Sequence, residues 1–249
     1  MLAKSRRVFS TQKDLTLNAR EPKCLSPQVS LWDTHFVDKI EFNPDLIDEC
    51  SKRDSSDEKR RLATESTLAT LDHHHLEIWS DGSVKNGLGA GAAILFSDNR
   101  PPIVSGRPSG QLSHSYRAEL QGISAGLDGV LQLQEDIDNK KLLICTDSQS
   151  SINALKTGPI SRTSNLLSHI WSQLSRLTQR GLSNITFQFT ASHCGIERNE
   201  MADKKADKAL TRCAAEQPLV PIPLDAMKNE IKLHVKTDWL NQLDKNNAR

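Results

Sequence analysis

The chain has 249 residues, a formal net charge of +1 at pH 7, and a composition of 37% hydrophobic and 25% charged residues. This length is sufficient for one sizeable core with extensions, and the composition is that of a soluble protein. No stretch approaches the roughly 20 consecutive apolar residues that span a bilayer, which excludes membrane insertion. The five cysteines form no Cys-x-x-Cys pair, so reduced thiols in an intracellular protein are expected, rather than disulfides or a zinc ribbon.

Residues 1–72 are expected to form a poorly ordered, charged N-terminal extension, because they lack a sustained apolar period. One helix, Asp57–Leu71, is predicted within it, with only a thin apolar stripe. Residues 1–20 contain five basic side chains and one acidic side chain. Arg7-Val8-Phe9-Ser10 resembles a mitochondrial presequence cleavage context, although a basic tail with a chance match is the favoured interpretation. The nucleus is the expected location, and the mitochondrion is the alternative.

Leu76–Ser83 is predicted to be a strand that stops at an Asp-Gly-Ser corner, with Asp81 at its end. A single Asp-Gly pair is also an ordinary turn, so Asp81 has a function only if other carboxylates reach the same point. Gly87–Phe96 and Pro101–Gly106 follow closely as strands, which predicts an antiparallel meander. The glycines of the second strand lack the Lys of a phosphate-binding loop, so close packing explains them better.

His114–Leu133 is predicted to be a helix, with Glu119 at the border of its apolar face. Lys141–Asp147 is a continuous apolar run that ends in an acid, which is typical of a buried strand in a parallel sheet. The remaining predicted elements are a helix over Ser148–Leu155, a helix with an apolar stripe from Leu166 to Leu177 that ends at Gly181, a strand over Ile185–Thr190 and an alanine-rich helix over Asn199–Thr211.

Carboxylates follow or border several of these elements. Asp81 and Asp147 both lie at strand ends, where open α/β sheets place their functional crevice. Asp203 shares a helix face with alanines, so it can approach a sheet closely, and Asp207 is the rival position one turn later. Such acids would repel one another unless cations neutralised them. All-oxygen ligands favour magnesium or manganese over zinc.

Four motifs occur in the order and on the elements of one known family. They are Ser80-Asp81-Gly82-Ser83, Tyr116-Arg117-Ala118-Glu119-Leu120, Cys145-Thr146-Asp147-Ser148-Gln149, and the segment from Ser192-His193-Cys194 to Ala202-Asp203. Residues 76–213 therefore resemble a type 1 ribonuclease H domain, of the kind found in non-LTR retrotransposon polyproteins, including trypanosomatid-like ones.

The resemblance implies an α/β ribonuclease H-like fold within residues 73–214. Its five-stranded mixed sheet would combine an antiparallel meander with two parallel strands, flanked by helices. The implied reaction is two-metal-ion hydrolysis of the RNA strand of an RNA/DNA hybrid, giving 5′-phosphate and 3′-hydroxyl ends. The implied cofactor is a pair of Mg²⁺ ions, with Mn²⁺ as the alternative. Besides the hybrid, the implied partners are a reverse transcriptase or a larger ribonucleoprotein.

Carried over by motif position, the metal ligands and catalytic acids are Asp81, Glu119, Asp147 and Asp203. His193 would support catalysis through proton transfer or product release. The implied contacts to the substrate are Ser83, Ser148 and Gln149.

The chain also departs from the family pattern. Ser115-Tyr116 replaces the asparagines of many cellular members, and Cys194 and Arg198 replace a commoner Ser and Gly. Residues 156–164 are too few for a basic substrate-gripping protrusion, so the basic N-terminal segment is the expected source of hybrid affinity. Residues 215–249 are predicted to be a linker and an amphipathic helix, Leu224–Leu243, that docks onto the domain.

Two other functions compete with the hydrolase. A catalytically inactive, domesticated domain could bind nucleic acid or act as a structural subunit, but the retention of all four acids argues against it. A DNA-cutting relative of integrases or resolvases fits poorly, because the histidine loop is that of ribonuclease H.

Overall fold

The computed structural model describes residues 34–51, 54–98, 100–159, 164–216 and 218–247. The basic N-terminal segment and its presequence-like pattern lie outside the described residues. Across the described ranges, no helix combines the length and the apolar character that a membrane crossing requires.

A mixed sheet of six strands forms the centre of the protein, in the order β1-β6-β5-β2-β3-β4. The strands are β1 (Ile40–Asn43), β2 (Leu76–Lys85), β3 (Leu88–Ser97), β4 (Arg100–Gly110), β5 (Lys141–Thr146) and β6 (Asn184–Phe189). The strands β2, β3 and β4 pair antiparallel, whereas β2, β5, β6 and β1 run parallel. The predicted α/β class, with its meander and parallel strands, is therefore confirmed.

The prediction of five strands is wrong, because β1 adds a sixth strand at the edge of the sheet. This strand comes from the region expected to be an N-terminal extension. It pairs with β6 from Ile40 opposite Ile185, and the ring of Phe42 stacks on Phe187 with centroids 5.1 Å apart. Four residues are too few to show a strand period, so tertiary pairing and aromatic contact stabilise β1. The limits of the expected domains stay a prediction.

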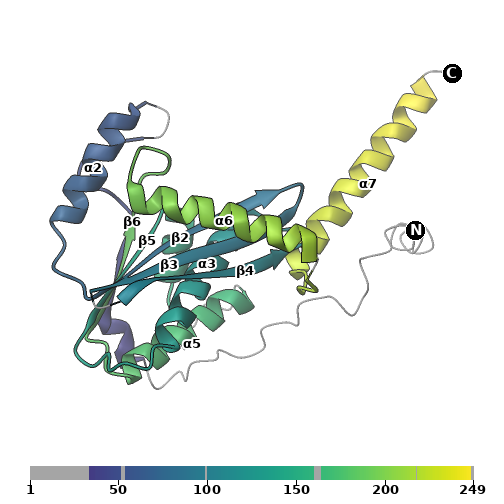
Figure 1. Ribbon diagram of the computed structural model, residues 1–249. Helices are drawn as coiled ribbons and strands as arrows, with labels where there is room; N and C mark the ends of the chain where they lie inside the picture. The colour runs from purple at the N-terminus through teal and green to yellow at the C-terminus, as the bar shows by residue number, and fades with distance from the viewer. Residues whose placement is uncertain (1–33, 52–53, 99, 160–163, 217, 248–249) are drawn as a thin grey trace.

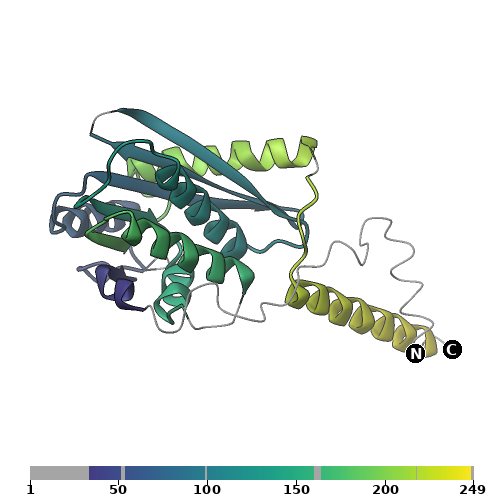
Figure 2. The same ribbon diagram turned by 90° about the horizontal axis from the view of Figure 1, so that it is seen from below.

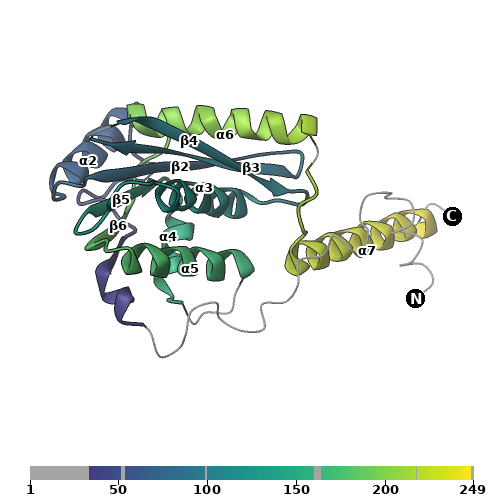
Figure 3. The same cartoon turned by 60° about the horizontal axis from the view of Figure 1, so that its bottom comes forward.

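Helices cover both faces of the sheet (Figure 1). The helices on one face are α3 (Ser115–Leu131), α4 (Gln149–Lys156) and α5 (Asn165–Gln179). On the other face lies α6 (Glu197–Glu216), with α2 (Asp57–Ala69) beside its N-terminal end, as Figure 3 shows. A short 3-10 helix, η2 (His35–Lys39), leads into β1.

The predicted corner at Asp81 is wrong, because β2 continues to Lys85. The turn into β3 instead uses Asn86 and Gly87, whose φ angles of 53° and 76° suit a tight hairpin. The parallel pairing of β2 with β5 nevertheless stops at Ser80 opposite Thr146. Asp81 is thus the first β2 residue beyond its pairing with β5, while it remains held by β3.

Glycines allow α3 to lie directly on β2 and β3. A Cβ atom at Gly82 would come within 2.3 Å of the Glu119 backbone nitrogen, and one at Gly91 within 2.2 Å of the Gly122 nitrogen. Gly82 and Gly91 are register partners in neighbouring strands. The packing role predicted for the glycines of the second strand is confirmed at Gly91, and these close contacts bring the start of α3 against the centre of the sheet.

The C-terminal helix α7 (Leu224–Asn247) extends away from the sheet and its helices (Figures 1 and 2). Val235 and Trp239, which belong to its predicted apolar stripe, are 63% and 59% exposed. The expectation that this helix docks onto the domain is wrong. An i+4 stripe shows that a helix has an apolar side, but it does not identify a surface that the side contacts.

Candidate functional site

Three carboxylates meet where the parallel strands β2 and β5 separate. Asp81 lies on β2, and Asp147 follows the last residue of β5 directly. Glu119 lies near the start of α3, which the glycine contacts hold against β2. Each acid is therefore positioned by a regular element whose backbone is fixed by the sheet.

Carboxylate oxygens of Asp81, Glu119 and Asp147 lie within 4.8 Å of one another. Asp81 and Glu119 are each only 5% exposed. The backbone N–H of Gly82 donates a hydrogen bond of 2.7 Å to Oδ1 of Asp81. Within the described part of the chain, Oε2 of Glu119 is buried and accepts no hydrogen bond. The group therefore contains more buried acceptor atoms than neighbouring donors can satisfy.

Burial makes the ionised state of these acids unfavourable. It raises the pKa of Asp81 from 3.8 to about 8, and the charges of Asp147 and Asp203 also raise this pKa. The hydrogen bond from the Gly82 N–H lowers it, but by less than burial raises it. The pKa of Glu119 also lies well above its ordinary value, first because of burial and then because of Asp147 and Asp81. A divalent cation would favour the ionised forms and occupy the unsatisfied oxygen, so the donor set fits such an ion.

The acids face a cavity of about 610 Å³. Its lining residues include Asp81, Glu119, Asp147, Ser148, Gln149, His193 and Asp203. Asp203, on α6, lies outside the tight group of three carboxylates but contributes to this wall. A volume of this size is typical of a ligand-binding cleft, so the cavity can admit a small molecule or one part of a larger substrate.

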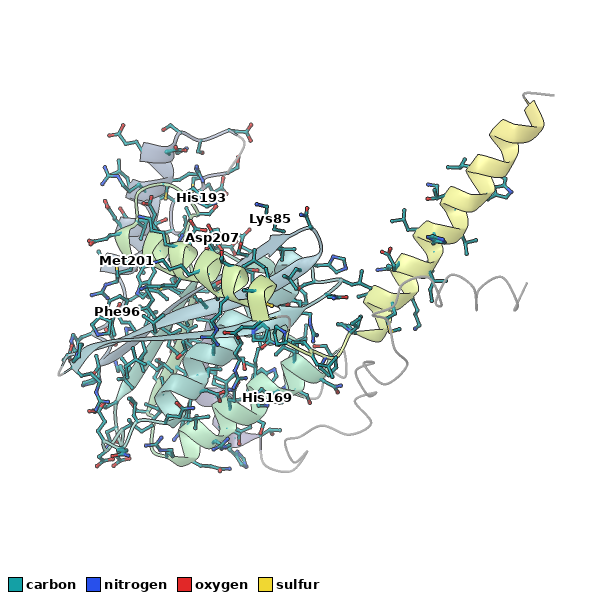
Figure 4. All side chains as sticks on the ribbon, turned by 45° about the vertical axis from the view of Figure 1, so that its right-hand side comes forward. Lys85, Phe96, His169, His193, Met201 and Asp207 are labelled. Carbon is teal, nitrogen blue, oxygen red and sulfur yellow. The ribbon has the colours of Figure 1, made fainter. Side chains whose placement is uncertain are left out.

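Ser83 does not line this cavity among the residues that the structure describes. Its hydroxyl instead donates a 2.7 Å hydrogen bond to Oδ1 of Asp207. Figure 4 shows Asp207 along α6, with His193 near the N-terminal end of that helix. The two acids predicted as rivals therefore lie in different surroundings. Asp203 lines the cavity, whereas Asp207 accepts a hydrogen bond from Ser83 on β2.

The two other predicted substrate contacts lie at the start of α4. The Ser148 hydroxyl caps this helix and accepts a hydrogen bond from the Ser151 backbone N–H. Nε2 of Gln149 donates to the carbonyl oxygen of Pro44 at 2.8 Å. Both side chains reach the cavity, and the amide of Gln149 is already engaged by the segment that follows β1.

His193 projects from an exposed position in the loop between β6 and α6. Its φ angle of 48° is in the left-handed region, which is uncommon for a residue other than glycine. The loop begins at Thr190, whose backbone N–H donates to the carbonyl oxygen of Thr146 at 3.0 Å. The histidine is thereby kept beside the end of β5, where Asp147 lies.

Sequence reasoning missed several residues of the cavity wall, and those that lie farthest from the predicted motifs in the chain are Cys50, Ser51 and Arg60. All three belong to the expected extension. Arg60 is buried on α2 together with Ala63, Thr64 and Thr67. That i, i+3, i+4, i+7 spacing is the one available signal, and it is faint because the face contains an arginine and threonines instead of large apolar residues.

Comparisons with known proteins identify the family of this chain. Residues 73–211, more than half of the chain, match the family model described as RNase H. No curated protein matches the chain. One similar solved structure is the N-terminal RNase H domain of a Mycobacterium tuberculosis protein, which was solved as a fusion with maltose binding protein. The two sequences are 19% identical, the TM-score is 0.43, and the match covers 57% of this chain and 98% of that one. RNase H1 of the archaeon Halobacterium salinarum is similar at 19% identity, with a TM-score of 0.42 and coverages of 55% and 98%. The family match shows that the chain belongs to the ribonuclease H family.

Proposed function

We propose that this protein is a divalent-metal-dependent endoribonuclease that hydrolyses the RNA strand of RNA/DNA hybrids. The observation that carries the proposal is the group of Asp81, Glu119 and Asp147, whose oxygens lie within 4.8 Å of one another with two of the side chains buried. A buried acidic group of this kind destabilises the fold unless a cation occupies it. Family membership supplies the substrate class.

Asp81, Glu119 and Asp147 would hold the cations, and Asp203 would contribute from the cavity wall. Oxygen ligands favour magnesium, with manganese as the alternative, and we propose two ions. When bound, such ions supply Lewis-acid activation of water and stabilise charge on the leaving oxygen. This reaction would leave 5′-phosphate and 3′-hydroxyl ends.

The remaining residues of the cavity would act on the substrate and its protons. His193 is exposed at the cavity, where its imidazole would take part in proton transfer or in product release. Ser148 presents a hydroxyl at the start of α4, where it could meet a sugar or phosphate oxygen. For Gln149 to contact the hybrid, its side-chain amide would have to break the hydrogen bond to the Pro44 carbonyl oxygen and donate to the hybrid instead.

We also propose that the domain derives from a non-LTR retrotransposon polyprotein and acts in the nucleus with a reverse transcriptase or a larger ribonucleoprotein. The support for this wider context is the form of the motifs. Ser115-Tyr116 precedes the helix acid as it does in retroelement members, and Cys194 and Arg198 mark a divergent histidine loop.

The test is a cleavage assay that compares an RNA/DNA hybrid, duplex RNA and duplex DNA of one sequence in Mg²⁺. We expect cleavage of the hybrid RNA strand alone, and loss of cleavage in EDTA. Asp147→Asn should abolish turnover while its circular dichroism stays that of the wild type and its thermal unfolding shows no loss of stability. Tight hybrid binding by the wild type without turnover would refute the proposal and favour a binding or structural role.

A further inference from the structure

The helix α2 is bonded to the histidine loop at the two residues that precede His193. The backbone N–H of Ala191 donates to Oγ1 of Thr64 at 3.2 Å, and Nη1 of Arg60 donates to the carbonyl oxygen of Ser192 at 2.9 Å. Thr64 is fully buried, and its hydroxyl donates in turn to the Arg60 carbonyl oxygen at 2.9 Å. Two side chains, one turn apart on α2, therefore hold the Thr190–Ala191 and Ser192–His193 peptide groups of the loop.

Arg60 is an unusual residue to place in this wall. It is only 7% exposed, it pairs with Asp57 on the same helix, and its Nε has no hydrogen-bond partner in the described part of the chain. Burying a guanidinium with an unsatisfied N–H costs stability. An apolar residue would be buried here at lower cost, so what the arginine adds is its polar contacts, and the one that reaches beyond its own helix is the bond to Ser192.

The loop has a reason to need such support. His193 has a left-handed φ angle, and a conformation of this kind persists only where the surrounding structure determines it. Inside the loop, Sγ of Cys194 contacts the carbonyl oxygen of Ala191 at 3.3 Å. On its far side, the loop continues into α6, where the Gly195 N–H donates to Oε1 of Glu200 at 3.0 Å. Arg60 and Thr64 supply the matching restraint on the near side.

We propose that Arg60 and Thr64 are positioning residues for His193, so that α2 is part of the catalytic unit. The helix precedes residues 73–211, which match the family model, so the inference concerns a segment outside the matched range. It rests on the proposed function, because the role of His193 in hybrid cleavage is what the two residues would support.

The kinetic test uses Arg60→Gln and Thr64→Val, with Lys59→Gln as the matched control. Lys59 is exposed on the same helix, so its variant removes one positive charge without touching the loop. We expect the kcat for hybrid cleavage to fall about 10-fold in each Arg60 and Thr64 variant, with KM changing less than about twofold. Thr64→Ser should restore kcat because it retains the hydroxyl, and Lys59→Gln should match the wild type.

A double-mutant cycle with His193→Ala distinguishes positioning from general loss of stability. If Thr64 and Arg60 act through the imidazole, their substitutions should lower kcat less than about twofold in the His193→Ala background. Equal losses in both backgrounds would overturn the inference. A wild type that does not cleave the hybrid would instead refute the proposed function, so the two failures are distinguishable.

Hydrogen exchange on the metal-free protein gives a readout without catalysis. In Thr64→Val, the Ala191 amide loses its acceptor and should exchange at least about 10-fold faster, while the amide of Thr190, bonded to Thr146, keeps its protection. Unchanged exchange at Ala191 would overturn the inference. Should Arg60→Gln fail to fold, the Thr64 series and this measurement still decide the question.

Discussion

Replacing Asp81 with asparagine should stabilise the metal-free protein while it abolishes cleavage. Asparagine has nearly the same shape and retains an oxygen that can accept the hydrogen bond from the Gly82 N–H. It removes one ionisable carboxyl from the group of Asp81, Glu119 and Asp147. Stability and activity should therefore change in opposite directions, which a merely structural aspartate would not produce.

The magnitude follows from the pKa of Asp81, which burial raises from 3.8 to about 8. The folded state then holds a proton that the unfolded state has released, so the free energy of unfolding falls as pH rises from about 4 to about 8. At 1.36 kcal/mol for each pH unit, the fall for one isolated group approaches about 5 kcal/mol. In the variant, Glu119 and Asp147 still repel each other, so only part of this unfavourable free energy is relieved. We therefore expect the free energy of unfolding to rise by about 2 kcal/mol at pH 8.

Urea unfolding in EDTA at pH 4 and pH 8 measures this difference. Asp81→Asn should unfold like the wild type at pH 4 and be more stable at pH 8. Mg²⁺ should then stabilise the wild type more than the variant, because the ion binds the folded acids. Asp48→Asn, at an exposed position, is the control for loss of one acid. Equal or lower stability of Asp81→Asn at pH 8 would refute the reasoning.

Three further substitutions test the fold and the site. Gly82→Ala should destabilise the protein by at least about 3 kcal/mol in urea unfolding, because its Cβ would lie 2.3 Å from the Glu119 nitrogen; a loss below 1 kcal/mol would contradict the close approach of α3. Asp203→Asn should lower kcat by at least about 10-fold and Asp207→Asn by less than about threefold, since only Asp203 lines the cavity; the reverse order in a hybrid-cleavage assay would show that the acids are assigned wrongly. Trp239→Ser should change the free energy of unfolding by less than about 0.5 kcal/mol, because the indole is 59% exposed on α7; a large loss would indicate that this helix packs onto the domain.

The sequence determined the elements that carry the acids, because each has a local signature. The apolar run before Asp147 is typical of a strand buried on both faces, and β5 is such a strand. The helical period around Glu119 likewise predicted α3 to within two residues of each end. The small residues of β3 indicated close packing before any partner helix was known, because a residue without a bulky side chain permits approach from any direction.

Contacts between distant segments were decided only by the tertiary structure. The strand β1 is too short to show a period and exists through its pairing with β6. The end of β2 was misplaced because Asp-Gly favours a turn locally, whereas ten successive pairings with β3 hold the strand straight through Lys85. The burial of Arg60 was equally hidden, because a charge in a mixed-charge run predicts a solvated helix face. Its hydrogen bond to Ser192 spans 132 positions, and no local pattern encodes a contact of that length.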